Sequence, residues 1–283
     1  MYRYILIGLV SMHLGLNAKH EQLSLQNALD KKLVSAKVHS LGGYQGYCIK
    51  MEVKNLSPDS LIILVEAGRR LNSIDEKNQD ILVVREQFVM LKKYEDKYID
   101  VKGYCCQANN HSPNAGAKYD VSVLADKTLV LLAHYLNVNT FANEVEQNAI
   151  WAISDNKNTA NVTAANDTLI LPLRNLVATI KGEPIPWYTF ATKTVNYLGG
   201  RMQTFPTVLR GKLNFNNGKE CYTTLHILND KGLEVGNIIK QWTLVGNNQT
   251  YNLNMPVAGL ANGKYTIELK NDEGELVKKE FKI

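Results

Sequence analysis

The sequence lacks the short motifs by which most enzymes are identified. It contains no Gly-x-Ser-x-Gly, no His-Glu-x-x-His, no phosphate-binding loop and no glycine-rich dinucleotide turn. It also has no Cys-x-x-Cys pair, and its histidines are dispersed without ligand spacing, which argues against a zinc site. The acidic residues lie mainly in predicted turns and on charged faces, where solvation explains them. We therefore expect a protein that has no catalytic residues, no metal and no cofactor.

Clustered charge and long apolar runs are also scarce. The 32 basic and 27 acidic residues are interspersed along 283 residues and give a net charge of +5. A nucleic-acid-binding protein would need a concentrated basic stripe, so we exclude that class of partner. After residue 18 no run approaches eighteen apolar residues, so no transmembrane segment is expected in the mature chain. The length is sufficient for two domains, each with its own core.

The first eighteen residues, MYRYILIGLVSMHLGLNA, have the pattern of a secretory signal peptide. Arg3 supplies the positive start, an apolar run follows from Ile5 to Leu16, and small-residue cleavage is expected at Ala18. The pattern predicts an exported protein that resides at the cell surface or in the extracellular space. The periplasm is the alternative.

The four cysteines allow a disulfide in an exported chain. Cys48 and Cys105 have similar contexts, Gly-Tyr-Cys in strand-like runs, and Cys106 follows Cys105 directly. Successive strand residues point to opposite faces, so only one of the vicinal pair can face Cys48. We expect a bridge from Cys48 to Cys105 or to Cys106.

Alternating apolar residues and turn signals divide residues 19–156 into short strands, followed by a helical hairpin at about 126–153. The alternation of Ile49, Met51 and Val53 predicts one buried and one solvated face. Asp126 is suited to cap a helix whose apolar stripe begins at Leu129. The fold class predicted from these features is mainly β, and this first domain is expected to be an immunoglobulin-like (Ig-like) antiparallel β-sandwich that carries the hairpin.

Residues 157–207 are expected to connect two domains, because they begin with a polar stretch and Pro172 disfavours a central strand. Trp187 and Tyr188 follow two prolines, and they are expected to pack in a connection between domains. The alternative is that they form, with Trp151 of the hairpin, a candidate binding surface. Residues 208–283 alternate most clearly, with turns at Gly218, Gly232, Gly263 and Gly274, and predict a second Ig-like sandwich.

The last block resembles the C-terminal β-sandwich domains of Bacteroidetes surface proteins, many of which are sorting signals for type IX secretion. The similarity lies in LANGKYTIEL from Leu260 and in the final strand GELVKKEFKI from Gly274. It implies that this domain sorts or anchors the protein.

The first domain resembles an uncharacterised bacterial secreted module through Cys106-Gln107, Ser112-Pro113 and the helix ending Gln147-Asn148-Ala149-Ile150-Trp151. That helix ending is also similar to the thioester domains of Gram-positive adhesins, which pair a strand cysteine with a helix glutamine. The resemblance implies a thioester between Gln147 and either Cys48 or Cys106, formed when a thiol displaces ammonia from the carboxamide. As a polar helix position, however, Gln147 needs no such role.

Taken together, these features predict an exported, non-enzymatic protein for binding, adhesion or assembly of a surface structure, with a protein or a glycan at the cell surface as its partner. Two alternatives stay open. One is a covalent adhesin with the cysteine–glutamine thioester, and the other is an accessory subunit of an envelope or secretion machine.

Overall fold

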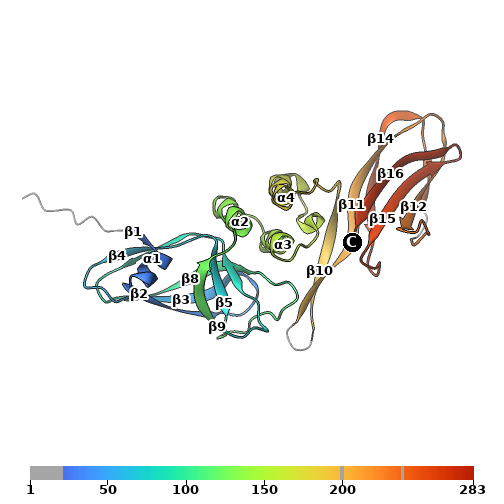
Figure 1. Cartoon of the computed structure of the whole chain (residues 1–283). Coiled ribbons are helices and arrows are strands. Elements are labelled where there is room, and N and C mark those ends of the chain that lie inside the picture. The colour runs from blue at the N-terminus through green and yellow to red at the C-terminus, as the bar shows by residue number, and fades with distance from the viewer. Residues whose placement is uncertain (1–21, 198–200, 237–238) are drawn as a thin grey trace, which may run out of the picture.

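The computed structural model describes residues 22–197, 201–236 and 239–283. The expected signal peptide, residues 1–18, lies outside the described residues. The chain is mainly β, with two β-domains separated by a helical segment (Figure 1).

The first domain is a closed six-stranded barrel, in which the strands pair in the order β2-β3-β8-β6-β5-β9. Inward-facing side chains of the barrel strands form one core with those of an attached three-stranded sheet, β1-β4-β7. A short helix, α1, follows β1. The elements are β1 (Gln22–Ser24), α1 (Leu25–Asp30), β2 (Val34–Ser40), β3 (Gln45–Asn55), β4 (Leu61–Val65), β5 (Arg69–Ser73), β6 (Ile81–Val83), β7 (Gln87–Leu91), β8 (Asp96–Cys105) and β9 (Lys118–Leu124).

We expected an open Ig-like sandwich here, and the structure shows a barrel instead. Strand β9 pairs with both β2 and β5, while β6 joins β5 to β8, so the sheet closes on itself. The predicted alternation in β3 is present, because Ile49, Met51 and Val53 are all fully buried. Alternation along one strand is the same in a barrel and in a sandwich, so it could not distinguish them.

The helical segment contains the predicted hairpin and one further helix. The hairpin consists of α2 (Lys127–Val138) and α3 (Asn143–Ser154), and Asp126 caps α2 by accepting from the amide nitrogens of Thr128 and Leu129. A 3-10 turn, η1 (Thr159–Asn161), and helix α4 (Asp167–Lys181) follow. Both lie within residues 157–207, which we expected to form a simple connection.

The second domain consists of two antiparallel sheets that share one core. One sheet has the order β10-β11-β14 and the other β13-β12-β15-β16. The domain begins at Tyr188 rather than near residue 208, because β10 pairs along β11. The strands are β10 (Tyr188–Asn196), β11 (Met202–Asn217), β12 (Cys221–Asn229), β13 (Ile239–Thr243), β14 (Gly246–Pro256), β15 (Lys264–Asn271) and β16 (Gly274–Lys282).

Strands β10 and β11 extend from the second domain toward the barrel and form what we call the arm (Figure 1). At its far end Met202 is fully buried against Trp151 and Ala108, with Tyr44 packed beside them. Arg201 forms an antiparallel bridge with His111 of the first domain. Both β-domains therefore contact the helical segment and, through the arm, each other.

Candidate functional site

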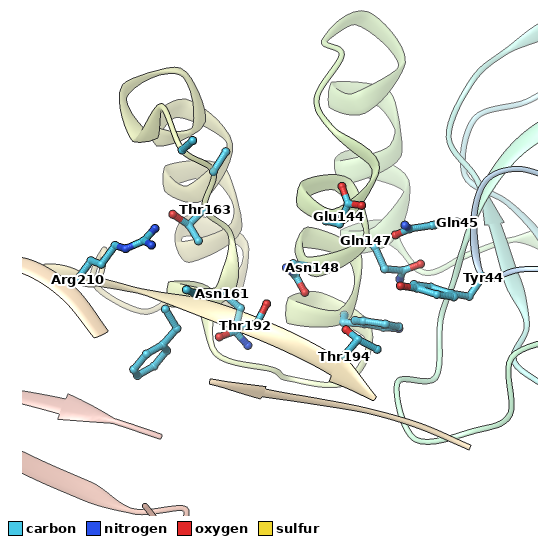
Figure 2. A pocket seen from close by; sticks show the side chains of 15 residues that line it. Tyr44, Gln45, Glu144, Gln147, Asn148, Asn161, Thr163, Thr192, Thr194 and Arg210 are labelled. Atoms are coloured by element: carbon cyan, nitrogen blue, oxygen red, sulfur yellow. The ribbon is translucent and has the colours of Figure 1, made fainter. Parts of the chain in front are cut away.

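A groove lies where the barrel, the helical segment and the second domain meet. Its first hollow encloses about 390 Å³ and is lined by side chains from all three parts. The barrel contributes Tyr44 and Gln45, and strands β10 and β11 contribute Thr192, Thr194 and Arg210 (Figure 2). From the helical segment come Glu144, Gln147, Asn148, Trp151, Asn161 and Thr163.

A second hollow of about 400 Å³ continues the groove over the outer face of the sheet β10-β11-β14. The two hollows share residues 163–165 and Arg210. The second is further lined by Trp187 and Tyr188, by Asp167 and Arg174 of α4, and by Lys212, Asn252 and Asn254 on the sheet. The polar lining is mostly uncharged in the first hollow and more highly charged in the second, and both hollows contain aromatic residues.

Helix α3, which forms one wall, is held on the barrel by a buried carboxylate. Glu146 is fully buried, and its Oε1 lies 2.8 Å from Arg85 Nη2 while its Oε2 lies 3.1 Å from Lys102 Nζ. Oε1 also accepts from the Phe141 amide nitrogen at 2.9 Å. A charge this deeply buried is tolerated only when paired, so the network fixes the first turn of α3 against β8.

Gln147, the next residue, fixes the same helix to the main chain of the barrel. Its Nε2 donates to the Cys105 carbonyl at 2.8 Å, and its Oε1 accepts from the Cys105 amide at 3.1 Å. Gln147 is 1% exposed, so both bonds are shielded from water. The structure thus gives the glutamine singled out in the sequence a docking role, in which its carboxamide pairs with backbone rather than with a thiol.

The cysteines are buried free thiols, and the expected bridge is absent among the residues that the structure describes. Cys48 and Cys105 both face the barrel core, while Cys106 faces the helices, as expected for neighbouring strand positions. Burial raises the pKa of Cys48 and the pKa of Cys106 to about 12 each. Both thiols are therefore neutral at ordinary pH and poorly nucleophilic. The thioester stays a prediction that these contacts do not favour.

The aromatic residues of the first hollow form a stacked pair. The ring centroids of Tyr44 and Trp151 are 5.9 Å apart with an interplanar angle of 11°. Partial burial, and then the nearby charge of Glu144, raise the pKa of Tyr44, so it remains a neutral phenol. Two buried polar atoms beside this pair, Trp151 Nε1 and Gln45 Oε1, have no hydrogen-bond partner in the described structure.

Trp187 brings a second aromatic surface to the other hollow. Its Nε1 donates to the Glu280 carbonyl at 2.6 Å, and Lys279 Nζ lies 5.0 Å from the ring centroid. Gly211 allows the indole to approach β11, because a Cβ there would lie 2.8 Å from the ring. Tyr188 is mostly buried, and its hydroxyl bonds to the Lys282 main chain. All three predicted aromatic binding residues therefore line the groove.

The third tryptophan, Trp242, lies elsewhere, on edge strand β13 of the other sheet. It is 54% exposed and packs edge-on against Tyr222. Trp242 is not among the residues that line either hollow.

Sequence reasoning did not identify Tyr44, Gln45, Asn161 or Arg210 as site residues. Tyr44 and Gln45 lie between Gly43 and Gly46, in what the sequence marks only as a turn. Asn161 belongs to the polar stretch interpreted as a linker, and Arg210 occupies an outward position of a regular strand. The glycine-flanked Tyr-Gln pair was the one local signal, since binding residues are often carried on loops that a rigid scaffold positions.

Two broader features bear on function. Within the described residues no group of three or more His, Cys, Asp or Glu side chains is arranged to hold a metal. Across residues 22–197, 201–236 and 239–283, no helix has the length and apolar character needed to cross a bilayer.

Comparison with known proteins adds no family assignment. No protein-family model matches the sequence, and no curated protein matches it significantly. The resemblances to sorting domains and to thioester adhesins accordingly stay predictions.

Proposed function

We propose that the protein is an exported, non-enzymatic binding protein of the cell surface or extracellular space, and that the interdomain groove is its binding site. The groove itself carries the proposal. Ligand sites are commonly concave and lie at domain interfaces, with aromatic surfaces and a few convergent polar groups. Both hollows combine these features, and each lies within the range of about 300–1,000 Å³ usual for ligand pockets.

The charged groups of the groove support binding over hydrolysis. Glu144 is the carboxylate that lines the first hollow, and Asp167 lines the second. Asp167 pairs with Arg174, and although partial burial raises the pKa of Asp167, the hydrogen bonds and charge of Arg174 bring it below the ordinary value. A general acid needs the opposite shift, because it must hold its proton near neutral pH.

Adhesion to an extracellular polymer is the activity we would measure. The full mature chain is applied to plates coated in parallel with mucin, a plant cell-wall polysaccharide, a yeast polysaccharide and collagen. We expect retention on at least one coating, reduced at least about tenfold by the double variant Trp187→Ala/Gln45→Ala. Trp242→Ala is the matched control and should be retained normally. Retention on no coating, or equal retention of the groove variant, would contradict the proposed function.

We further propose that the second domain has Ig-like topology. Its first, second and fifth strands form one sheet, and its third, fourth, sixth and seventh form the other. This division is that of an Ig-like sandwich with an added edge strand beside the third.

Because β11 crosses residue 208, a deletion that tests the sorting role of the second domain must start before Tyr188. Secretion unchanged by that deletion would exclude the sorting role.

A further inference from the structure

We infer that the occupant of the groove is an uncharged oligosaccharide, and this inference rests on the binding function proposed above. Two unsatisfied atoms on residues that line the first hollow point to it. Trp151 is 3% exposed, and its indole N–H has no acceptor within the described part of the chain. Gln45 Oε1 is likewise buried and has no donor there. Buried polar groups are almost always hydrogen-bonded, so a wall with an unpaired donor and an unpaired acceptor indicates a missing partner.

Sugar hydroxyls satisfy both requirements at once. A hydroxyl donates one hydrogen bond and accepts two, so a polyol can supply an acceptor for Trp151 and a donor for Gln45. The half-buried ring of Tyr44, stacked on Trp151, offers an apolar surface beside these polar atoms. Trp187 offers another in the second hollow. Aromatic surfaces flanked by amides and hydroxyls suit a ligand whose rings have apolar faces and polar rims.

The charges of the first hollow favour a neutral ligand. Its ionic lining residues are Glu144 and Arg210, which lie on opposite sides, one from α3 and one from β11 (Figure 2). Their charges cancel, and most of the remaining polar lining consists of amides and hydroxyls such as Asn148 and Thr192. A charged ligand would leave one of these two groups facing a like charge, which is unfavourable.

A peptide is a poorer fit to the same walls. Peptides commonly bind by adding a strand to a free sheet edge or by placing side chains in apolar slots. The edge strand that lines the first hollow, β10, is packed against η1, which buries Ala160 in the sandwich core. The apolar lining of the first hollow, apart from its aromatic pair, consists of alanines and the 1%-exposed Phe190, so no apolar slot is open.

The continuity of the groove indicates a chain of sugars rather than a single one. The hollows of about 390 and 400 Å³ join at residues 163–165 and at Arg210. An extended ligand could therefore contact Tyr44 and Gln45 at one end and Trp187 at the other. Binding to both hollows should make affinity rise with the number of sugar units.

The test is isothermal titration calorimetry of the full mature chain with neutral hexasaccharides of glucose, mannose, xylose and N-acetylglucosamine. We expect at least one to bind, and its disaccharide to bind at least about tenfold more weakly. Gln45→Ala and Trp187→Ala should each weaken binding about tenfold or more, and Trp242→Ala should leave it unchanged. Gln45→Ala is the key variant, because Gln45 Oε1 has no partner to lose and folding should be unaffected.

Three results would overturn the inference: no hexasaccharide binds, the groove variants bind normally, or a uronic-acid oligomer binds more tightly than every neutral one. Periodate treatment of the plate coatings separates the two proposals. Groove-dependent retention that survives periodate would leave the binding function standing and remove the oligosaccharide. Loss of that retention after periodate, together with hexasaccharide binding, is the result we expect.

Discussion

The substitution Gln147→Ala tests how the wall of the groove is held in place. It removes both hydrogen bonds between α3 and the main chain of Cys105. The Cys105 amide keeps a second acceptor, the Tyr44 carbonyl at 3.0 Å, whereas its carbonyl loses the donor at 2.8 Å. A buried polar group deprived of its partner costs about 1–3 kcal/mol, and the one methylene that is lost costs about 0.8 kcal/mol. We expect the free energy of unfolding to fall by about 3 kcal/mol.

Urea denaturation followed by tryptophan fluorescence measures this effect, with Gln45→Ala as the matched control. Both variants truncate a glutamine in the same hollow, but Gln45 Oε1 has no partner. The control should therefore change the free energy of unfolding by less than about 0.5 kcal/mol. If Gln147→Ala unfolds at the wild-type urea concentration, Gln147 does not dock the helix.

The intact masses of the wild-type protein and of the Gln147→Ala variant test whether the cysteine–glutamine thioester forms. With Gln147 bonded to backbone, we expect the wild-type mass to equal that of the mature sequence. A mass about 17 Da lower, restored to the sequence mass by Gln147→Ala, would show that ammonia had been lost to a thioester. That result would refute the docking role.

Three further results are expected. Glu146→Gln should lower the free energy of unfolding by about 3–5 kcal/mol in urea titrations, because it leaves the buried Lys102 and the partly buried Arg85 without their carboxylate. In the folded protein Arg174 lowers the pKa of Asp167 below its ordinary value of 3.8. The ion pair therefore stabilises the fold at pH values above 3.8, and this stabilisation is lost as the pH falls through the lowered pKa of the folded state. The deficit of Asp167→Asn against wild type should thus be present at pH 7 and shrink in acid, and a deficit that does not change with pH would contradict it. Cys48 and Cys106, with pKa values near 12, should resist iodoacetamide in the native protein and react fully in guanidinium, as counted by mass spectrometry.

Local patterns in the sequence predicted local structure well. The Asp126 cap and the apolar stripe from Leu129 define α2, and the alternation of β3 buries Ile49 and Met51 as expected. Closure of the barrel could not be predicted in this way. It depends on the pairing of β9 with β2 and β5, strands far apart in sequence whose partners no local pattern specifies.

Helix α4 was not predicted, because Pro172 was used only as an argument against a central strand and the helical spacing around it was not considered. Pro172 lies inside the helix, where it removes a backbone donor, yet Ile170, Leu173 and Val177 form a buried stripe at helical spacing. Packing of that stripe onto α2 and α3 outweighs the local cost. Gly182, left-handed at φ 66°, ends the helix in the usual way.

Some of the residues that line the groove were singled out in the sequence, for a different reason. Trp151, Trp187 and Tyr188 stood out as large aromatics in unusual contexts, and all three line the groove. Arg210 and Gln45 join them only because the domains meet, and neither carries a sequence signal that reflects this meeting. A surface assembled from three separate segments can be recognised only after the long-range contacts are known.

The arm holds the two domains together, because its far end packs against the first domain and the helical segment. Met202 is seated against Trp151 beside Tyr44, and these two aromatics also line the first hollow. Any hinge motion that parts the barrel from the sandwich must therefore unseat Met202 and widen the hollow in the same step. A ligand bridging the hollow would resist that opening, so occupancy and the angle between the domains are mechanically linked.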